Sequence, residues 1–512
     1  MRRQPRREIC AGTCLQAGTA RLPSSGLPQL VHEPSIAMRR ARVSDQFDLV
    51  VIGLGSAGLA AARFAAHIGK RVAVVERDRP GGDCLWTGCV PSKTLLASAR
   101  SAQHARTAPA LGVHVSEPTA DADAVWTRIR DVQREIAEGD DSPQALTKLG
   151  LEVVTGSARL QSATTVDVDG RQVTTRFTLI CTGSRPAVPA IPGLVESGYL
   201  TSDTVWNLTT IPRRLVVIGA GSIGCELGQA MQRLGSQVTI IESAPRILSA
   251  EEPDLAASLA HHLTGEGVEI AVGVVIERVE LVDGTRVVHG RVGGEPVRWS
   301  ADDLLVATGR VANVDDLGLS EVGIATTPAG IAVDSRLRTV RASVFAAGDV
   351  TGRPRFTHVA AHDATVAVRN MFFPGSTEAA TLVPRCTFTD PELANVGMTI
   401  NEARARHGAA AVAVHRSDLT RSDRGRADGL QTGGMVLVTV KGRLVGASVL
   451  APAAGEIVHS LALAISQRLR LRDLSALVHV YPTLTWEVAL LAAQASYDRA
   501  RRWRFLSRFV GR

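Results

Sequence analysis

The stretch Phe47-Asp-Leu-Val-Val-Ile-Gly53-Leu-Gly55-Ser-Ala-Gly58 decides the fold of the first part of this 512-residue chain. Its apolar run predicts a buried parallel strand, and its glycines allow a tight turn and a close approach to a pyrophosphate. The helix expected at residues 57–68 would direct its N-terminal amides at the phosphates. A second strand, expected at residues 71–75, ends in Glu76, which is placed to accept hydrogen bonds from a ribose. Strand, glycines, helix, strand and acid in this order predict a dinucleotide-binding unit.

The same unit occurs a second time. Leu215-Val-Val-Ile-Gly219-Ala-Gly221-Ser-Ile-Gly224 opens a helix, and Val238-Thr-Ile-Ile-Glu242 closes the next strand. In both copies the third glycine and the acid are 18 positions apart. An internal repeat of this kind predicts two dinucleotide sites in one chain. The alternative is two structural α/β units with chance glycines, and the matching acids count against it.

Two cysteines follow the first unit, in Gly82-Asp-Cys84-Leu-Trp-Thr-Gly-Cys89-Val-Pro-Ser-Lys93. Pro91 suits the first turn of a helix, so Cys89 is expected at a helix N-terminus. A thiolate in that position and near a lysine is stabilised, which lowers the pKa of the thiol. The motif therefore predicts a redox disulfide beside the first cofactor. A structural disulfide and two inert buried thiols are the alternatives.

Lys93 is one of only four lysines among 57 basic side chains. Base composition explains why arginine is the default cation of this chain. A lysine retained four residues after Cys89 suggests a site that needs a compact ammonium group. The alternative is an ordinary helix residue.

Composition limits the classes of protein that remain. A chain of this length holds about three domains. Hydrophobic residues make up 45% of it without a run of 18, so no membrane span is expected. The seven cysteines do not form a secreted disulfide framework, and no spacing suits a metal site. We therefore expect a cytoplasmic protein without a metal.

The two ends of the chain carry its positive charge. Residues 1–44 hold eight arginines and two acids, and residues 499–512 hold six arginines and no acid. The body between them is therefore about −5 within a net charge of +7, which argues against nucleic acid as a partner. The first segment is expected to be a disordered extension, or translation starts at Met38; a transit peptide is the alternative. The last segment would pack on its own domain or lie on an anionic membrane surface.

Three further motifs complete a family pattern. They are Leu179-Ile-Cys-Thr182-Gly183-Ser-Arg185, Leu304-Leu-Val-Ala-Thr-Gly309-Arg310 and Val344-Phe-Ala-Ala-Gly-Asp349-Val350. With the cysteine motif and both fingerprints, the chain resembles the class I flavin-dependent pyridine nucleotide-disulfide oxidoreductases over about residues 45–498. This family includes dihydrolipoyl dehydrogenase, glutathione reductase and mercuric reductase. The resemblance implies an α/β fold with two Rossmann-like domains, for FAD and NAD(P), and a C-terminal α+β dimerisation domain.

The resemblance also implies a domain order and a set of cofactor residues. The FAD domain would span 45–192 and 313–382, the NAD(P) domain 193–312 and the dimerisation domain 383–498, so a homodimer is expected. Asp349 would bind the ribityl chain of FAD. The residues expected at the two cofactors are Gly53, Gly55, Gly58, Glu76, Lys93, Thr182, Gly183, Asp349, Gly219, Gly221, Gly224, Glu242 and Gly309.

The expected chemistry is a two-electron relay. A hydride delivered to one face of a flavin needs an exit on the other face, and a disulfide opens to one thiol and one thiolate. By resemblance, Cys89 is the flavin-side thiol and Cys84 the interchange thiol that meets the acceptor. Lys93 would pair with Glu226 beside the flavin. Glu242 favours NADH over NADPH, because a carboxylate accepts from a 2′-hydroxyl and repels a 2′-phosphate, although Arg246 nearby could soften this.

The segment His479-Val-Tyr481-Pro-Thr-Leu-Thr-Trp-Glu487 departs from the family pattern. Dihydrolipoyl dehydrogenases have an acid-base histidine, supplied by the partner subunit, directly before this proline. Tyr481 stands there, and an unperturbed tyrosine is a poor base at pH 7. His479 and Tyr481 are still expected to face the site across a dimer interface. The segment looks more like the mercuric reductase version, but no cysteine follows Cys386.

Three functional hypotheses remain open. The first is an NADH-dependent flavoenzyme that uses Cys84 and Cys89 to reduce a small disulfide, a metal ion or another soft electrophile. The second is a diaphorase or quinone reductase whose cysteines only tune the flavin. The third is a redox-sensing or interaction flavoprotein whose turnover is incidental.

Overall fold

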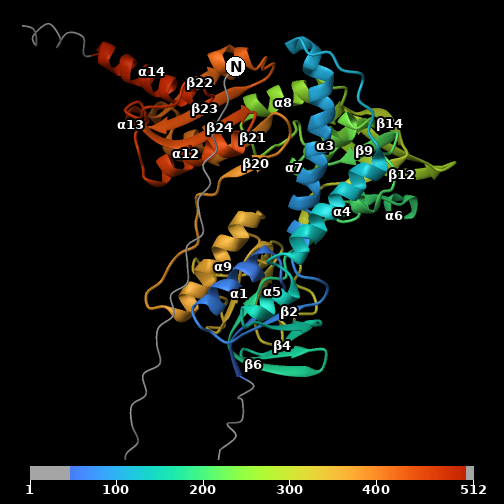
Figure 1. Ribbon diagram of the computed structural model, residues 1–512, viewed down its shortest axis with the longest axis vertical. Helices are drawn as coiled ribbons and strands as arrows, with labels where there is room; N and C mark the ends of the chain where they lie inside the picture. The colour runs from blue at the N-terminus through green and yellow to red at the C-terminus, as the bar shows by residue number, and fades with distance from the viewer. Residues whose placement is uncertain (1–45, 503–512) are drawn as a thin grey trace, which may run out of the picture. The chain divides into compact units, whose positions relative to one another are not determined.

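The computed structural model describes residues 46–502 of the chain, with side chains to residue 497 (Figure 1). The basic segment at 1–44 and most of that at 499–512 lie outside the described residues, so the predictions made for them are not tested. The described residues 46–502 belong to one compact unit.

The first fingerprint lies in a seven-stranded sheet. The strand order is β3 (Glu152–Thr155), β2 (Val72–Glu76), β1 (Gln46–Ile52), β6 (Arg171–Ile180), β5 (Thr165–Val168) and β4 (Ala158–Ser162), with β19 (Val344–Ala346) also paired to β6. Strands β1, β2, β3, β6 and β19 pair in parallel. Helices α1 (Ser56–His67) and α9 (Thr357–Phe372) pack side by side, and their alanines fill the core against β1 and β2 (Figure 1). A segment near residue 360 therefore completes the domain that begins at residue 46.

The second fingerprint repeats this arrangement. The parallel order is β11 (Glu269–Val272), β10 (Gln237–Glu242), β9 (Arg214–Ile218), β15 (Asp303–Val306) and β8 (Leu200–Thr201). Helices α7 (Ser222–Arg233) and α8 (Pro253–Gly265) pack on it. An antiparallel sheet of β12 (Val274–Val282), β13 (Thr285–Val292) and β14 (Glu295–Ala301) is inserted before β15. The repeat read from the sequence is a repeat of structure.

The third sheet is antiparallel and lies in the C-terminal part of the chain. Its order is β20 (Arg385–Thr387), β21 (Glu392–Gly397), β24 (Arg443–Ala451), β23 (Gly434–Val440) and β22 (Val412–Asp418). A turn at Lys441-Gly442 joins β23 to β24, with φ angles of 50° and 79°. Three helices pack against this sheet: α10 (Ile400–His407), α12 (Ala454–Ser466) and α14 (Trp486–Arg502). Two Rossmann-like units and a C-terminal α+β part confirm the predicted fold class.

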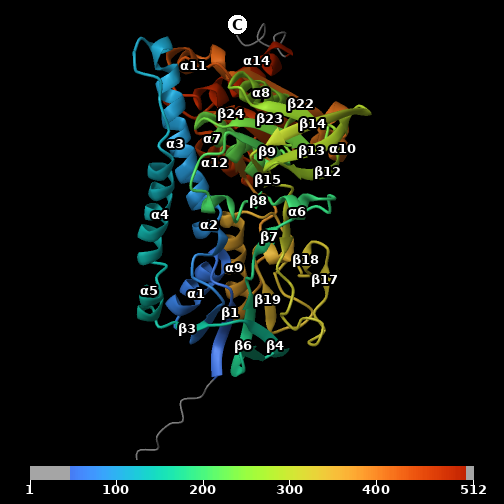
Figure 2. The same ribbon diagram turned by 90° about the vertical axis from the view of Figure 1, so that its right-hand side faces the viewer.

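Two helices connect the cysteine motif to the rest of the molecule. Cys84 lies in the short α2 (Gly82–Trp86), and Cys89 is the first residue of α3 (Cys89–Thr107). Helix α3 packs against α4 (Ala122–Glu138) and against α7 (Figure 2). The motif therefore bridges the first and second sheets. The short elements are β7 (Ser184–Pro186) paired with β16 (Arg310–Ala312), β17 (Thr326–Thr327) paired with β18 (Gly330–Ile331), α5 (Pro143–Lys148), α6 (Leu194–Ser197), α11 (Asp423–Ala427) and α13 (Leu471–Leu474).

Candidate active site

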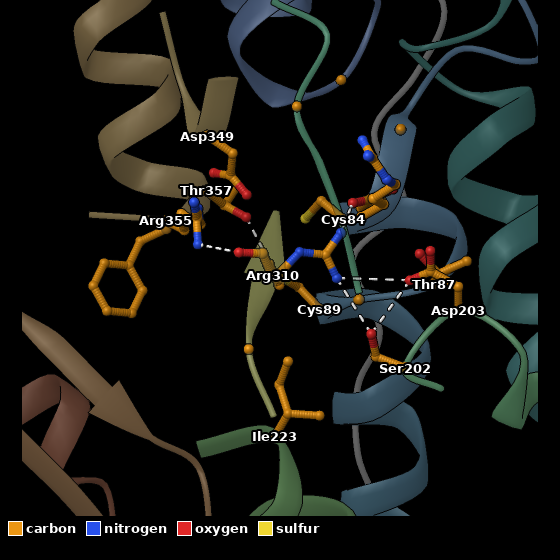
Figure 3. Close-up of a pocket in the computed structure, with 18 of the residues that line it drawn as sticks. Cys84, Thr87, Cys89, Ser202, Asp203, Ile223, Arg310, Asp349, Arg355 and Thr357 are labelled. Carbon is orange, nitrogen blue, oxygen red and sulfur yellow. Dashed lines mark hydrogen bonds and ion pairs between the residues drawn. The ribbon is translucent and has the colours of Figure 1, made fainter. Parts of the chain in front are cut away.

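One continuous cleft of about 2040 Å³ is lined by both fingerprints and by the cysteine motif (Figure 3). Most residues predicted at the site meet there: Gly53, Gly55, Glu76, Cys84, Cys89, Lys93, Thr182, Gly183, Gly219, Gly221, Glu226, Glu242, Gly309 and Asp349. Gly58 and Gly224 lie behind the wall, where each helix packs on its strand. A site large enough for two dinucleotides is thus assembled from segments far apart in the chain.

The glycines of the two fingerprints have two different roles. A Cβ at Gly58 or Gly224 would lie 1.9 or 2.0 Å from the carbonyl oxygen of the first glycine of its own fingerprint. These two glycines are therefore required by helix–strand packing. A Cβ at Gly221 would meet no heavy atom within 4 Å, and at Gly55 the nearest lies 3.8 Å away. The middle glycine in each copy leaves backbone open to the cleft, where a pyrophosphate would bind.

The two strand-end acids are held by the same hydrogen bonds. Oε2 of Glu76 accepts the amide of Leu54 at 2.7 Å, and Oε2 of Glu242 accepts the amide of Ala220 at 2.7 Å. The other oxygen of each accepts an amide two residues further along the chain. Each carboxylate is therefore fixed at the cleft with lone pairs left for a ribose.

Asp349 lies at the N-terminal end of a 3₁₀ turn on the opposite wall. Its Oδ2 accepts a hydrogen bond from Ser184 Oγ at 2.6 Å, next to the predicted Thr182-Gly183 segment. Thr182 in turn donates to the carbonyl of Asn313 at 2.7 Å. The first bond joins β7 to the segment that follows β19, and the second joins the end of β6 to the segment that follows β16.

Cys84 and Cys89 are unpaired thiols in this structure, and their acidities differ. The hydrogen bond from Cys84 lowers the pKa of Cys89 to about 6, against the effect of burial, with help from Thr357 and the charge of Lys93. Cys89 Sγ lies 3.2 Å from Thr357 Oγ1. The same hydrogen bond, together with burial, raises the pKa of Cys84. These directions favour Cys89 as the thiolate of the pair and Cys84 as the proton donor.

Lys93 and Glu226 form an ion pair at the cleft between α3 and α7. Lys93 Nζ lies 2.8 Å from Oε2 of Glu226, whose side chain is buried. Oε1 of Glu226 accepts the amide of Phe388 at 2.9 Å, and the Lys93 ammonium sits 4.2 Å from the Phe388 ring centre. The pairing read from the family resemblance is therefore present in the geometry.

Arg310 is a further site residue, with several polar partners, that the sequence did not predict. Its guanidinium pairs with Asp83, donates to Ser184 Oγ at 2.7 Å and to Ser202 Oγ at 3.2 Å, and lies 3.6 Å from Asp203. Burial raises the pKa of Asp83 to about 6, against the effect of Arg310. Asp83 and Arg310 both lie inside recognised motifs, but nothing in their spacing indicates that they meet. Thr357, eight residues after Asp349, was missed for the same reason.

Tyr481 and His479 do not line this cleft. Tyr481 Oη donates to Asp423 Oδ2 at 3.0 Å, and this contact raises the pKa of the phenol. His479 Nδ1 lies 3.1 Å from the carbonyl oxygen of Leu477. Glu487 Oε2 accepts a hydrogen bond from Ser417 Oγ at 2.5 Å. The structure holds one chain, so a role for this segment in the partner subunit's site stays a prediction.

The described part of the chain was searched for metal-binding clusters and for membrane-spanning helices. Within residues 46–502, no cluster of histidine, cysteine and acid side chains could hold a metal ion. The helices of the same range include none that is long and apolar enough to cross a membrane.

The cleft, the paired fingerprints and the dithiol define a flavin- and nicotinamide-dependent oxidoreductase. The chain belongs to the pyridine nucleotide-disulphide oxidoreductases: the family's main domain matches residues 47–364 and its dimerisation domain residues 383–491. It is therefore an FAD-dependent enzyme that exchanges electrons with NAD(P)H, as the resemblance implied, and the second match supports a homodimer.

Similar proteins come from several branches of this family. A mercuric reductase from Bacillus cereus is 34% identical over 88% of this chain and 72% of its own length. A dihydrolipoyl dehydrogenase from Chlamydia muridarum is 32% identical over 88% of this chain and 97% of its own length. Among solved structures, the HOCl-induced flavoprotein disulfide reductase RclA from Escherichia coli superposes with a TM-score of 0.78 at 27% identity, over 87% of this chain and 99% of that one.

Proposed function

We propose that this enzyme passes two electrons from NADH through FAD to the Cys84–Cys89 pair, and from Cys84 to a small disulfide, a thiol-bound metal ion or another soft electrophile. The observation that carries the proposal is the placement of both cysteines in the cleft that the two fingerprints share, with Cys89 as the first residue of α3 and its Sγ 3.2 Å from Thr357 Oγ1. The lowered pKa of Cys89 and the raised pKa of Cys84 agree with this placement. A relay of this type needs one thiolate at the cofactor and one thiol that meets the acceptor.

The chain's residues have separate roles in this proposal. FAD, when bound, supplies a centre that accepts a hydride and releases an electron pair. Lys93 and Glu226 orient the reacting edges of the two cofactors through their ion pair. The electron pair opens the disulfide to a thiolate on Cys89 and a thiol on Cys84, with the proton of the hydride kept on sulfur. Thr357 holds the thiolate by its hydroxyl group.

The proposed electron donor is NADH rather than NADPH. Glu242 is fixed at the strand end by amides of its own loop, so its charge stays where a 2′-phosphate would lie. Arg246 is the nearby cation that could offset this charge. Its guanidinium donates to the carbonyls of Leu248, Ser249 and Glu251 at 2.9, 2.5 and 3.1 Å, which supports its exclusion from cofactor binding.

The acceptor is proposed as a class only. Mercuric reductases stand among the relatives, which makes a mercuric thiolate one candidate, and dihydrolipoyl dehydrogenases make a dithiol compound another. Tyr481 before the proline supports an acceptor whose release does not need a strong base. In the proposed homodimer, Tyr481 and His479 of each subunit approach the dithiol of the other.

Alkylation after reduction tests the proposal. The protein is reduced anaerobically with NADH, treated with iodoacetamide and assayed with an aromatic disulfide, mercuric glutathione and a quinone. We expect loss of disulfide and mercury reduction, with quinone reduction kept, because alkylation removes the dithiol and leaves the flavin. Protein alkylated without reduction is the control and should keep all three activities.

The alternative functions give different results in the same assay. A diaphorase would lose none of its activities after alkylation. A redox-sensing or interaction protein would turn over none of the three acceptors at a useful rate, alkylated or not.

A further inference from the structure

Arg355 is a positive charge on the cofactor wall that no predicted role explains. It lies between Asp349, expected at the ribityl chain, and Thr357, which contacts Cys89. All three side chains line the same cleft (Figure 3). Arg355 would therefore belong to the wall that holds FAD, together with Asp349 and Thr357.

Backbone carbonyls from two other segments hold the guanidinium in place. Nη1 donates to the carbonyl of Arg310 at 2.5 Å, and Nη2 to that of Ala329 at 3.3 Å. Nε is buried and has no hydrogen-bond partner among the described residues. A donor left without an acceptor at a ligand cleft indicates a group that gains its partner from the ligand.

The charge of Arg355 is not neutralised within the part of the chain that the structure describes. Other arginines nearby have acidic partners: Arg310 pairs with Asp83, and Arg353 pairs with the buried Asp363 at 2.7 Å. No described carboxylate forms an ion pair with Arg355. The N-terminus of α9, two residues further on, adds a partial positive charge to the same wall. This end of the cleft therefore attracts negative charge.

The Cys89 thiolate is not the anion that the Arg355 guanidinium stabilises. Cys89 Sγ contacts Thr357 Oγ1 at 3.2 Å, whereas the hydrogen bonds of the Arg355 guanidinium go to backbone carbonyls. The pyrophosphate of FAD is negatively charged in both redox states, so the charge that distinguishes the two states is the one that hydride transfer adds. Hydride transfer from NADH adds two electrons and one proton to FAD, so the reduced cofactor carries one more negative charge and NAD⁺ one more positive charge.

We propose that Arg355 stabilises the negative charge of reduced FAD and so makes the bound flavin a stronger electron acceptor from NADH. This inference rests on the proposed function for its electron donor. Arg355 is a positioning and charge-setting residue, and it acts on the reduced form of the cofactor more than on the oxidised form.

The test compares Arg355→Gln and Arg355→Lys. Gln keeps a hydrogen-bond donor and loses the charge, while Lys keeps the charge. The readouts are the two-electron midpoint potential of bound FAD, measured against reference dyes, and the Kd of oxidised FAD for the apoprotein. Both are measured in a Cys84→Ser, Cys89→Ser background, so that failure of the dithiol relay cannot affect the result. Arg341→Leu is the control, because Arg341 also donates to a backbone carbonyl but lies outside the cleft.

For Arg355→Gln we expect the preference for reduced over oxidised FAD to fall about tenfold, which is about 30 mV for a two-electron couple. The Kd of oxidised FAD should change less than about threefold, and Arg355→Lys and Arg341→Leu should keep the wild-type potential. An unchanged potential in Arg355→Gln, or an equal loss of affinity for both forms, would overturn the proposal. If Arg355→Gln does not fold, Arg355→Met is measured with the same expectation.

Discussion

At the scale of single residues, a hydrogen bond makes the two thiols different. Cys84 donates to Cys89, and this one contact lowers the pKa of the acceptor and raises that of the donor. The sequence predicted the thiolate from a helix N-terminus and a lysine. It could not predict the contribution of Thr357, which lies 268 residues away along the chain.

Replacing the donor should therefore change the reactivity of the acceptor. In reduced wild-type protein, Cys89 is alkylated as a thiolate above a midpoint near pH 6, and its reactivity is lost as the pH falls below that value. In Cys84→Ala the midpoint should rise by about two units toward that of a free thiol. Peptide-resolved alkylation rates across pH 4–10 measure this. An unchanged midpoint would show that the hydrogen bond does not set the acidity.

Replacing Lys93 and replacing Glu226 should shift the pKa of Cys89 in opposite directions. Lys93 lowers the pKa of Cys89 and Glu226 raises it. Lys93→Met should raise the alkylation midpoint of Cys89, and Glu226→Gln should lower it, each by about one unit. Shifts in the same direction would contradict the assigned electrostatics. Lys148→Met, on α5, is the matched control and should leave the midpoint unchanged.

At the scale of elements, the fold repeats one strand–turn–helix device. The sequence predicted both copies because their periodicity, glycines and acids are local signals. The amides that fix Glu76 and Glu242 were not predictable, since a hydrogen bond across 22 positions leaves no periodic trace. The cleft that joins both copies to Arg310 and Arg355 also depends on packing between segments that only the tertiary structure brings together.

In the second copy, substitution of one glycine should weaken cofactor binding, and substitution of the other should destabilise the fold. Gly221→Ala adds a methyl group where nothing lies within 4 Å, so the protein should fold with full FAD content. Its Kd for NADH should rise about tenfold, because the methyl group occupies the approach of the pyrophosphate. Gly224→Ala forces a Cβ to 2.0 Å from a backbone oxygen and should destabilise the protein by about 1–3 kcal/mol.

Calorimetry of the apoprotein and NADH titration of the holoenzyme check this pair of variants. Equal loss of stability in both, or normal NADH affinity in Gly221→Ala, would contradict the assignment of the two glycines.

At the scale of the whole molecule, the segment between α13 and α14 carries an apolar surface near Tyr481. Val478 is 99% exposed and Val480 is 76% exposed in the single chain. An apolar surface of this kind is typical of an interface. The sequence predicted a dimerisation domain here by resemblance, but which side chains reach the partner subunit depends on quaternary structure and is not encoded in local pattern.

A double substitution, Val478→Asp with Val480→Asp, should therefore give a monomer in sedimentation equilibrium. FAD content and reduction of the flavin by NADH should be kept. Disulfide reduction should fall at least tenfold, because the proposed approach of Tyr481 of the partner subunit to the dithiol is lost. Val340→Asp, at a residue 72% exposed in the first domain, should stay dimeric. If the double variant stays dimeric, Val478 and Val480 do not form the dimer interface.

The flavin–dithiol relay itself is tested most directly by anaerobic titration with NADH while the flavin spectrum is followed. After two electrons, wild-type protein should show a long-wavelength charge-transfer band from the Cys89 thiolate to oxidised flavin, and Cys89→Ser should lack it. Direct bleaching of the flavin in wild-type protein after two electrons, with no such band, would contradict the relay.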